Sequence, residues 1–324
     1  MLQSMLFLWL GPLLWTTFVR RCEAQDGLKS IRIEAHSLEQ PYLDSDLGSR
    51  HWDFGGNTVI RTDRYVRLTP ERQSQRGWLW SKSPLTATNF EITVQFKIHG
   101  NNHLFGDGMA LWITETHNVQ GPVYGSTDRF KGLGLFIDTY KNNRPSTVFP
   151  YVMVMMGDGH TPYDSTHDGK ANELAGCSAK GIRNSEHDTS LRLTYFQDQF
   201  LKLELDYKGK GEWEPCFQVD ASATDVKIPQ TAYLGFSAET GELTEYHDVI
   251  SVETRNLYDR QYQSHSTGSK YSKSEKEPVD ARYDDVSRGS WWMSLLKALL
   301  LLLVLAAAYV GYTVYRANQR KSRF

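Results

Sequence analysis

The stretch GLGLFIDTYKNN, residues 132–143, begins with the pattern of a β-strand and ends in polar residues. Leu133, Leu135 and Ile137 alternate with smaller or opposite-facing residues, so one side of this strand can be buried. The same alternation runs through residues 90–98. Shorter stretches with this period lie at residues 191–195, 201–207 and 232–236. Because Gly, Asn, Asp and Pro clusters separate these stretches and no internal repeat is present, the pattern predicts one large all-β domain, an antiparallel β-sandwich.

The polar end of the first stretch carries oxygen atoms at a regular spacing. Asp138, Tyr140 and Asn142 lie two residues apart, which places all three on one face of an extended segment. A carboxylate, a backbone carbonyl and an amide oxygen are ligands that suit a hard cation such as calcium. A strand end followed by an Asx-type turn is the simpler alternative. Two further stretches, GDG at residues 106–108 and YDSTHDG at residues 163–169, favour the cation.

Polar residues that core packing does not require recur along the chain. They are Asp107, Asp138, Asn142, Asp164, Asp168 and the turn Gly241-Glu242-Leu243. Acidic residues that crowd together repel one another unless a cation neutralises them. A sugar site needs similar chemical groups, namely a rigid pocket with carboxylate and amide oxygens, backbone amides and one aromatic face. The sequence therefore favours a cation site combined with a sugar site.

Length and composition set limits on the class of protein. The chain has 324 residues, which is long enough for one large domain or two small ones. Its formal net charge of −2 includes no basic excess, so nothing in the composition favours a nucleic-acid partner. Aromatic residues make up 12% of the chain, which is typical of β-rich domains.

The beginning of the chain has the pattern of a secretory signal. The apolar run from Met5 to Val19 is too short for a membrane span. It is followed by Cys22 and Ala24, which suit the −3 and −1 positions of a cleavage site. Residues 1–24 are therefore predicted to be a signal peptide. Because two arginines follow the apolar run, an uncleaved anchor is the alternative.

The end of the chain has the pattern of a membrane anchor. Residues 298–314 carry no charge and follow two tryptophans, so residues 291–315 are predicted to be a transmembrane helix. Residues 316–324 contain four basic residues and no acidic one, which makes this tail cytosolic by the positive-inside rule. Residues 258–290, rich in Ser, Lys, Asp, Glu and Tyr, are predicted to be a flexible stalk. The arrangement is that of a single-pass type I membrane protein.

Cysteine usage agrees with an oxidising compartment. Removal of the signal peptide leaves two cysteines, Cys177 and Cys216. In the lumen they are predicted to pair, and two buried free thiols are the alternative. The chain has no Asn-x-Ser/Thr sequon, so no N-linked glycan is expected on the protein itself.

Several longer motifs resemble an L-type (leguminous-type) lectin domain. They are HGNNHLFGDGMALWIT, GPVYGSTDRFKGLGLFIDTYKNN, VFPYVMVMM, DGKANELAGC and HDVIS, in this order. The vesicular integral-membrane lectin branch of early secretory cargo receptors is the most similar branch. The resemblance covers about residues 28–257, together with the signal, stalk, single span and short tail. It implies a concanavalin-like antiparallel β-sandwich (jelly roll) for a lumenal lectin domain at residues 25–257.

The resemblance also implies particular roles for residues of this sequence. The calcium ligands are Asp138, the backbone carbonyl of Tyr140, Asn142 and Asp168. The mannose contacts are Ser74, Asp107, Asn142 and the turn Gly241-Glu242-Leu243. Cys177 and Cys216 match the disulfide of the family. Two positions depart from its pattern, because Ser165 occupies the place of a sugar-contacting His and Glu242 the place of a frequent Asp.

The function implied by the resemblance is calcium-dependent binding of high-mannose N-glycans on glycoproteins. The protein would act without catalysis, as a cargo receptor in ER–Golgi transport or quality control. Its location would be the membrane of the endoplasmic reticulum, the ER–Golgi intermediate compartment or the Golgi. The tail ends in KSRF, residues 321–324, which resembles export signals that vesicle coat proteins recognise. Enforcing topology is the alternative role of its charges.

Two other functions are compatible with the sequence. Ser165 and Glu242 suggest a degenerate lectin domain that recognises polypeptide cargo or partner receptors without sugar. A glycoside hydrolase is the second alternative, because Glu204 and Asp206 share one face of the LELDY segment at residues 203–207. The next position on that face is Lys208, so the two carboxylates are better explained as the solvent face of a strand.

Overall fold

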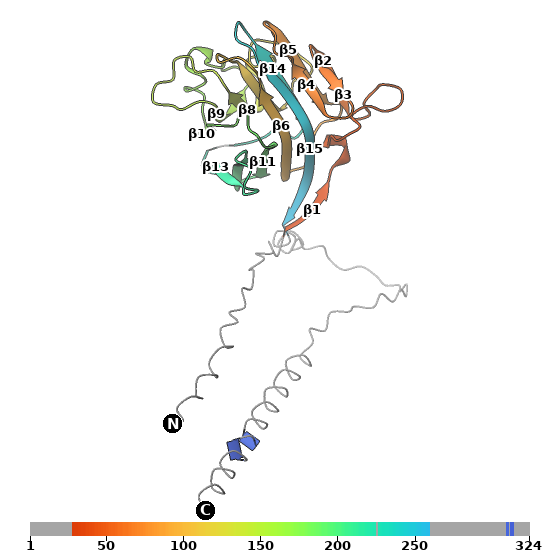
Figure 1. Cartoon of the computed structure of the whole chain (residues 1–324), viewed down its shortest axis with the longest axis vertical. Coiled ribbons are helices and arrows are strands. Elements are labelled where there is room, and N and C mark those ends of the chain that lie inside the picture. Colours follow the sequence, from red (N-terminus) through yellow and green to blue (C-terminus); the bar gives the residue numbers. More distant parts are fainter. Residues whose placement is uncertain (1–27, 225, 260–308, 311, 314–324) are drawn as a thin grey trace, which may run out of the picture. The chain divides into compact units, whose positions relative to one another are not determined.

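The computed structural model describes residues 28–224, 226–259, 309–310 and 312–313 (Figure 1). The predicted signal peptide (1–24), the stalk beyond residue 259 and the tail (316–324) lie outside these residues. Of the predicted transmembrane helix at 291–315, only residues 309–310 and 312–313 are described, and their backbone is helical. Among the described residues, no helix is both long enough and apolar enough to cross a membrane.

Two antiparallel sheets form the domain of residues 28–259. The strands of the eight-stranded sheet are β1 (Leu28–Arg32), β3 (Val59–Arg61), β4 (Tyr65–Thr69), β6 (Phe90–His99), β11 (Thr189–Phe196), β12 (Phe200–Asp206), β13 (Glu214–Asp220) and β15 (Tyr246–Asp259). Their order is β13-β12-β11-β6-β15-β4-β3, and β1 pairs with β15. Figure 1 shows the long strands β6 and β15 side by side through the middle of the domain.

The seven-stranded sheet carries the stretch quoted at the beginning. Its strands are β2 (Trp52–Gly56), β5 (Gln75–Ser81), β7 (Gly108–Thr114), β8 (Lys131–Asp138), β9 (Tyr151–Asp158), β10 (Ala175–Ser178) and β14 (Tyr233–Thr240), in the order β10-β9-β8-β7-β14-β5-β2. The described domain also contains two short 3-10 helices, η1 (Glu34–His36) and η2 (Ser165–His167). The two antiparallel sheets confirm the predicted all-β architecture.

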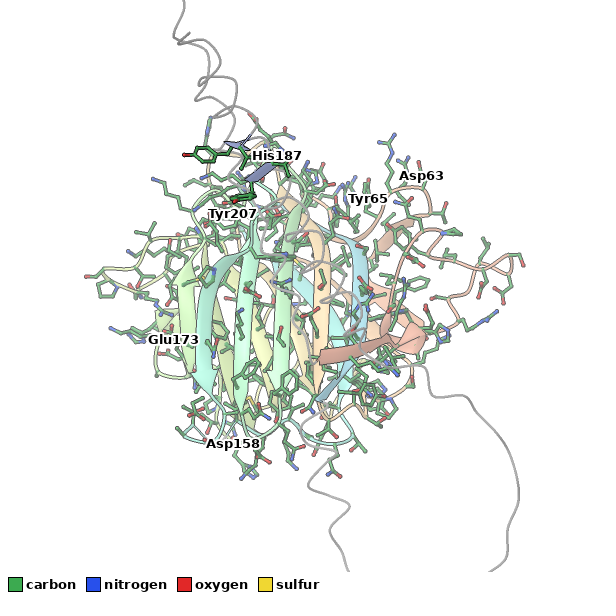
Figure 2. The ribbon with its side chains drawn as sticks, turned by 90° about the horizontal axis from the view of Figure 1, so that it is seen from below. Asp63, Tyr65, Asp158, Glu173, His187 and Tyr207 are labelled. Atoms are coloured by element: carbon green, nitrogen blue, oxygen red, sulfur yellow. A yellow bond between two sulfur atoms is a disulfide. The ribbon has the colours of Figure 1, made fainter. Side chains whose placement is uncertain are left out.

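The main core lies between the two sheets. Strand β6 buries every second residue, from Phe90 to Ile98, as its sequence alternation predicts. Strands β7 and β8 of the other sheet contribute Met109, Leu111, Ile113, Leu133, Leu135 and Ile137 to the same cluster. Figure 2 shows the strands side by side, with Asp158 and Tyr207 near opposite ends of the sandwich.

A second, smaller core covers the outer face of the seven-stranded sheet. Trp112 and Phe136 point away from the main core and meet Tyr124 and Phe130, which belong to the loop between β7 and β8. Strand β7 is consequently buried along its whole length, and β8 after its first residue. Alternate residues of 132–138 therefore face the main core and the second core, and both faces are buried. Asp138 lies at the end of the outer face, which also carries Phe136.

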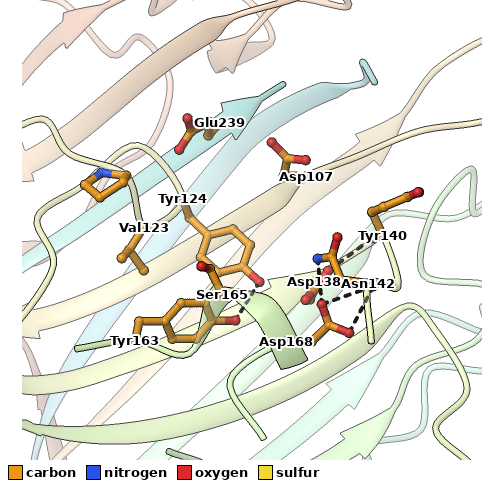
Figure 3. A pocket seen from close by; sticks show the side chains of 11 residues that line it. Asp107, Val123, Tyr124, Asp138, Tyr140, Asn142, Tyr163, Ser165, Asp168 and Glu239 are labelled. Atoms are coloured by element: carbon orange, nitrogen blue, oxygen red, sulfur yellow. Dashed lines mark hydrogen bonds between the residues drawn. The ribbon is translucent and has the colours of Figure 1, made fainter. Parts of the chain in front are cut away.

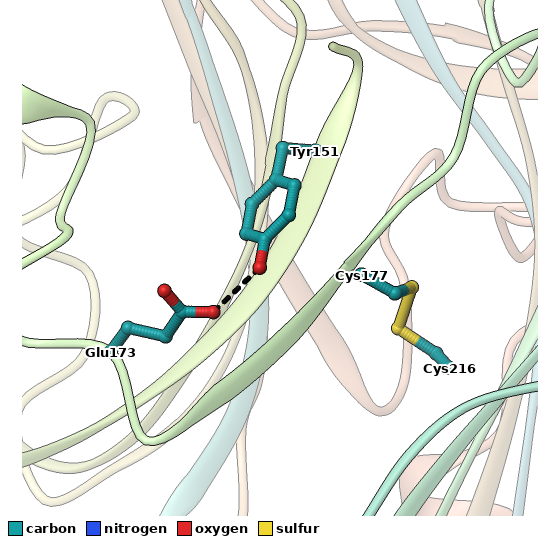
Figure 4. The surroundings of a disulfide bond; sticks show 4 residues. All are labelled: Tyr151, Glu173, Cys177 and Cys216. Carbon is teal, nitrogen blue, oxygen red and sulfur yellow. Dashed lines mark hydrogen bonds between the residues drawn. A yellow bond between two sulfur atoms is a disulfide. The ribbon is translucent and has the colours of Figure 1, made fainter. Parts of the chain in front are cut away.

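A disulfide joins the two sheets at one edge. Cys177 of β10 and Cys216 of β13 are bonded, with 5.3 Å between their Cα atoms (Figure 4). Each strand is the outermost of its sheet on that side. This bond confirms the predicted pairing of the two cysteines.

Replacing both Cys177 and Cys216 by Ser is expected to lower the free energy of unfolding by about 4 kcal/mol, because the bond closes a loop of 39 residues in the unfolded chain. Urea unfolding followed by tryptophan fluorescence measures the change. A reducing agent should shift the unmodified chain by the same amount and leave the double variant unaffected. A double variant as stable as the oxidised parent would contradict the expectation.

Candidate functional site

A cavity of about 200 Å³ lies on the outer face of the seven-stranded sheet, where β8 ends (Figure 3). It is lined by Asp107, Pro122, Val123, Tyr124, Asp138, Tyr140, Asn142, Tyr163, Ser165, Asp168 and Glu239. Six of these eleven residues are among the predicted site residues. They come from segments that are far apart in sequence, so the cavity exists only in the folded domain.

Two buried carboxylates face each other at the floor of the cavity. Asp138 ends β8 and is 5% exposed, and its Oδ1 accepts a hydrogen bond from Tyr140 N at 3.1 Å. Asp168 is 2% exposed and has a left-handed backbone with φ of 52°. Its Oδ1 accepts a hydrogen bond from Asn142 Nδ2 at 2.7 Å. Among the described residues, neither carboxylate forms an ion pair.

The electrostatics of this pair favour a bound cation. Burial raises the pKa of Asp138 well above its ordinary value, and the negative charge of Asp168 raises it further. The oxygens available are two carboxylates, the Asn142 amide and the Tyr140 backbone carbonyl. No cluster of three or more His, Cys, Asp or Glu side chains that could hold a metal occurs in the described part of the chain. This all-oxygen set is what calcium prefers, and it does not suit zinc.

Arg144 fixes the loop that carries Asp168 without neutralising the carboxylate. The buried guanidinium donates from Nη1 to the backbone carbonyl of Asp168 at 3.1 Å and pairs with Glu173. It lies over the Tyr151 ring, 4.1 Å from the ring centroid. Tyr151 in turn donates its hydroxyl to Glu173 Oε1 at 2.7 Å (Figure 4). Arg144 is therefore paired with Glu173, and it contacts the backbone of Asp168 but not its carboxylate.

Asp107 forms the opposite wall of the cavity. Its peptide bond to Gly106 is cis, its N–H donates to Glu239 O at 3.2 Å, and its carbonyl accepts from Thr139 N at 3.2 Å. Burial raises the pKa of Asp107 to about 6, and the charge of Glu239 adds to this effect. The side chain of Asp107 is thus held beside the calcium candidates by the backbone of two neighbouring segments.

The remaining predicted sugar contacts adjoin this wall. Ser74 N donates to Gly241 O at 3.0 Å, which ties the loop after β4 to the turn after β14. A Cβ atom on Gly241 would lie 3.1 Å from Asp107 Oδ2, so this turn approaches the carboxylate closely. Glu242 is exposed and its carbonyl accepts from Gln73 Nε2 at 2.9 Å. Leu243 and Tyr140 both lie near Gly106.

The segment with the unusual serine lies at the mouth of the cavity. Ser165 begins η2, is exposed and lines the cavity. His167 ends the same helix and is also exposed, but its Nδ1 lies 3.1 Å from Asp164 Oδ2. His167 therefore lies against Asp164 and is not among the residues that line the cavity.

Three polar lining residues were not expected from the sequence. Tyr124 and Tyr163 place their hydroxyls 3.2 Å apart, and their rings pack on Phe136. Glu239 precedes the predicted turn by two residues on β14. The GPVYG sequence before β8 was the one available signal for Tyr124, because two glycines in five residues indicate a loop that approaches other backbone closely.

Known proteins resemble this chain over most of its length. The sequence profile described as the legume-like lectin family matches residues 29–264. The chain belongs to the legume-like lectin family. An L-type lectin-like domain-containing protein of Schizosaccharomyces pombe, C126.08c, is 37% identical over 297 residues, 91% of each chain. Human vesicular integral-membrane protein VIP36 is 37% identical over 313 residues, which is 92% of this chain and 86% of that protein.

The fold of this chain is similar to that of a solved structure of a relative. The VIP36 exoplasmic/lumenal domain in its Ca²⁺/Man3GlcNAc-bound form superposes with a TM-score of 0.63 and 42% identity. The comparison covers 70% of this chain and 92% of that one. It supports the concanavalin-like arrangement of the two sheets in this legume-like lectin.

Membership in the lectin family also means that the protein is not an enzyme. The Glu204 carboxylate was predicted on the solvent face of its strand, but its side chain is only 11% exposed. It is covered by Arg192 and Lys202, whose nitrogens lie 2.7 and 2.8 Å from its oxygens. Glu204 is thus a paired structural residue of this legume-like lectin, on β12 of the eight-stranded sheet, and it does not line the cavity.

Proposed function

We propose that this chain is a calcium-dependent lectin that binds high-mannose N-glycans in the cavity at the end of β8. The observation that carries the proposal is the pair of buried carboxylates, Asp138 and Asp168, without a cationic partner among the described residues. The ligands proposed for calcium are these two side chains, the Asn142 amide oxygen and the Tyr140 carbonyl. Bound calcium supplies the positive charge that keeps both carboxylates ionised.

Sugar binding requires hydroxyl groups to meet preset donors and acceptors. Asp107 offers carboxylate oxygens, and the backbone of the Gly241-Glu242-Leu243 turn offers amide groups. The hydroxyls of Ser74 and Ser165 offer further hydrogen bonds to sugar. The serine side chain at position 165 is shorter than the imidazole that the family usually carries there, so its hydroxyl reaches less far. The Asn142 amide turns its oxygen toward the metal; one of its two N–H groups donates to Asp168, and the other is left for sugar. This assignment agrees with the ligands named for VIP36, calcium and Man3GlcNAc.

Calorimetry tests the proposal directly. A high-mannose oligosaccharide is titrated into the full chain in detergent, once with calcium and once after calcium has been removed. Heat only in the presence of calcium is expected. Binding of partner polypeptides that survives calcium removal, together with no heat from glycan, would instead favour the polypeptide-recognising alternative.

Acidification is expected to reduce the stabilisation that calcium gives. The pKa of Asp107 is raised to about 6 and that of Asp138 is raised well above its ordinary value, both mainly by burial. Stability from these groups is present in the calcium-free chain at low pH and is lost as pH rises through their folded-state pKa values. Calcium favours the ionised forms, so the rise in Tm on adding calcium should be larger at pH 7 than at pH 5.

The comparison with and without calcium removes the effect of other groups that titrate in this pH range. Burial lowers the pKa of His36, which sits in η1, so it also affects Tm in this pH range. Its effect is the same with and without calcium and cancels from the difference. The Tm is followed by tryptophan fluorescence after dialysis into calcium-free or calcium-containing buffer. A calcium increment that is equal at the two pH values would contradict the assignment.

The cellular role is proposed from the sequence beyond the described residues. Residues 1–24 act as the signal peptide, residues 291–315 as the single transmembrane helix, and residues 316–324 as a cytosolic tail. Human VIP36, which is named as a vesicular integral-membrane protein, aligns with 92% of this chain. We therefore infer a cargo receptor for high-mannose glycoproteins in ER–Golgi membranes, with vesicle coat proteins as partners of the tail. Protease protection of residues 25–257, but not of the tail, in intact microsomes tests this topology.

A further inference from the structure

One carboxylate of the cavity has no role in the proposed calcium and mannose site. Glu239 lies on β14, and its side chain points to the same outer face as Ser237, whose hydroxyl donates to Tyr124 O at 2.6 Å. Glu239 lines the cavity together with Asp107 and Val123. Figure 3 shows it beside Asp107 and apart from the group of Asp138, Asn142 and Asp168. It therefore marks a second region of the cavity.

The Glu239 carboxylate is held in one orientation. Its Oε1 accepts from Arg76 Nε at 2.7 Å and from Arg76 Nη2 at 2.5 Å. Its Oε2 accepts from Gly125 N at 3.0 Å, and its side chain is 14% exposed. A carboxylate has about four acceptor positions, and these contacts use three. One acceptor position on Oε2 is therefore left for a ligand hydroxyl.

Arg76 places donors next to this acceptor. A guanidinium has five N–H groups, and Glu239 uses two of those on Arg76. Its Nη1 has no hydrogen-bond partner among the described residues, and the side chain is 45% exposed. Arg76 is not itself among the residues that line the cavity, but its ion pair with Glu239 joins an acceptor in the lining to a partly exposed group with further N–H donors. Such a pair matches the two hydroxyls of a vicinal diol, of which one donates and the other accepts.

We propose that Glu239 and Arg76 form a second sugar subsite, which binds hydroxyl groups of the residue linked to the mannose at Asp107. This inference rests on the proposed lectin function and extends it to glycan specificity. Pro122 and Val123 of the adjoining loop line the cavity beside Glu239 and provide an apolar surface for the sugar ring.

The charge of the cavity selects neutral glycans for this subsite. The carboxylates in its lining are Asp107, Asp138, Asp168 and Glu239. One calcium ion and Arg76 offset three of these four charges at most. A phosphorylated or sialylated sugar would add further negative charge, so the ligand is an uncharged oligosaccharide with adjacent hydroxyls.

The test compares two ligands on the full chain in detergent at saturating calcium. Calorimetry measures the affinity for methyl α-mannoside and for a high-mannose oligosaccharide. Glu239→Gln is expected to weaken oligosaccharide binding about tenfold, because one hydrogen bond to a charged group is lost, and monosaccharide binding less than about threefold. Arg76→Met should reduce the preference for the oligosaccharide in the same direction. Glu204→Gln is the matched control, since Glu204 is an arginine-paired carboxylate of similar exposure outside the cavity.

The possible results separate the two levels of the hypothesis. Losses in Glu239→Gln that are equal for the two ligands would overturn the subsite and assign Glu239 to holding the loop at Gly125. No loss for either ligand would also overturn it. If the unmodified chain gives no heat with either ligand, the lectin function fails and the subsite with it. A selective loss that Glu204→Gln does not share supports the subsite.

Discussion

Asp168→Asn is expected to lower the calcium affinity of the chain at least about 100-fold and to eliminate measurable glycan binding. The variant removes one of two charged ligands from a site where both carboxylates are buried, and even neighbours of metal ligands typically contribute 10- to 100-fold. Without the metal, the Asn142 amide loses the ligand that orients its oxygen, so its N–H is no longer directed at sugar. Calcium titration and glycan calorimetry measure the two losses.

The matched control for Asp168 is another buried carboxylate. Asp248 is 3% exposed and pairs with Arg67 through hydrogen bonds of 2.7 and 2.8 Å in the eight-stranded sheet. Asp248→Asn should destabilise the fold, because it weakens a buried ion pair, but it should leave calcium affinity unchanged in the folded protein. Equal calcium affinities for the Asp168 variant and the parent would remove Asp168 from the site.

The sequence was sufficient to predict the fold because most strands reveal one buried face. Strand β6 alternates between core and partly exposed positions, and this period is visible without any structure. Strands β7 and β8 are different, since the long loop that joins them, together with Tyr163 from a later loop, covers their outer face. Periodicity reports that a face is apolar, but it does not identify the loop that covers it. The second core around Trp112 and Phe136 was therefore not predicted.

The site was predictable where its residues are local or carry a known motif. The spacing of Asp138, Tyr140 and Asn142 follows from one extended segment, and the structure places all three in the cavity lining. Glu239 depends instead on sheet order. Strand β14 lies between β7 and β5, which are remote from it in sequence, and this arrangement alone brings Glu239 to Asp107 and Arg76. Such a contact has no signature in a single sequence.

Asp107→Asn is expected to weaken glycan binding at least about 100-fold while calcium still binds. The carboxylate is the principal acceptor proposed for sugar hydroxyls, and two lost hydrogen bonds to a charged group account for a change of this size. The amide keeps the shape of the side chain but replaces one acceptor by a donor. Calorimetry at saturating calcium measures the loss, and a calcium titration of the same variant shows whether the metal site is intact.

The stability of the same variant distinguishes a binding role from damage to the fold. Burial and the nearby Glu239 raise the pKa of Asp107 to about 6, so its ionised form is unfavourable in the calcium-free domain at pH 7. The neutral amide of Asp107→Asn relieves this charge, and the Tm of the calcium-free chain should stay the same or rise. Because most damaging substitutions lower Tm, the combination of lost glycan binding and retained stability identifies Asp107 as a sugar contact. A lower Tm together with weaker calcium binding would mean that Asp107 serves the fold or the metal instead.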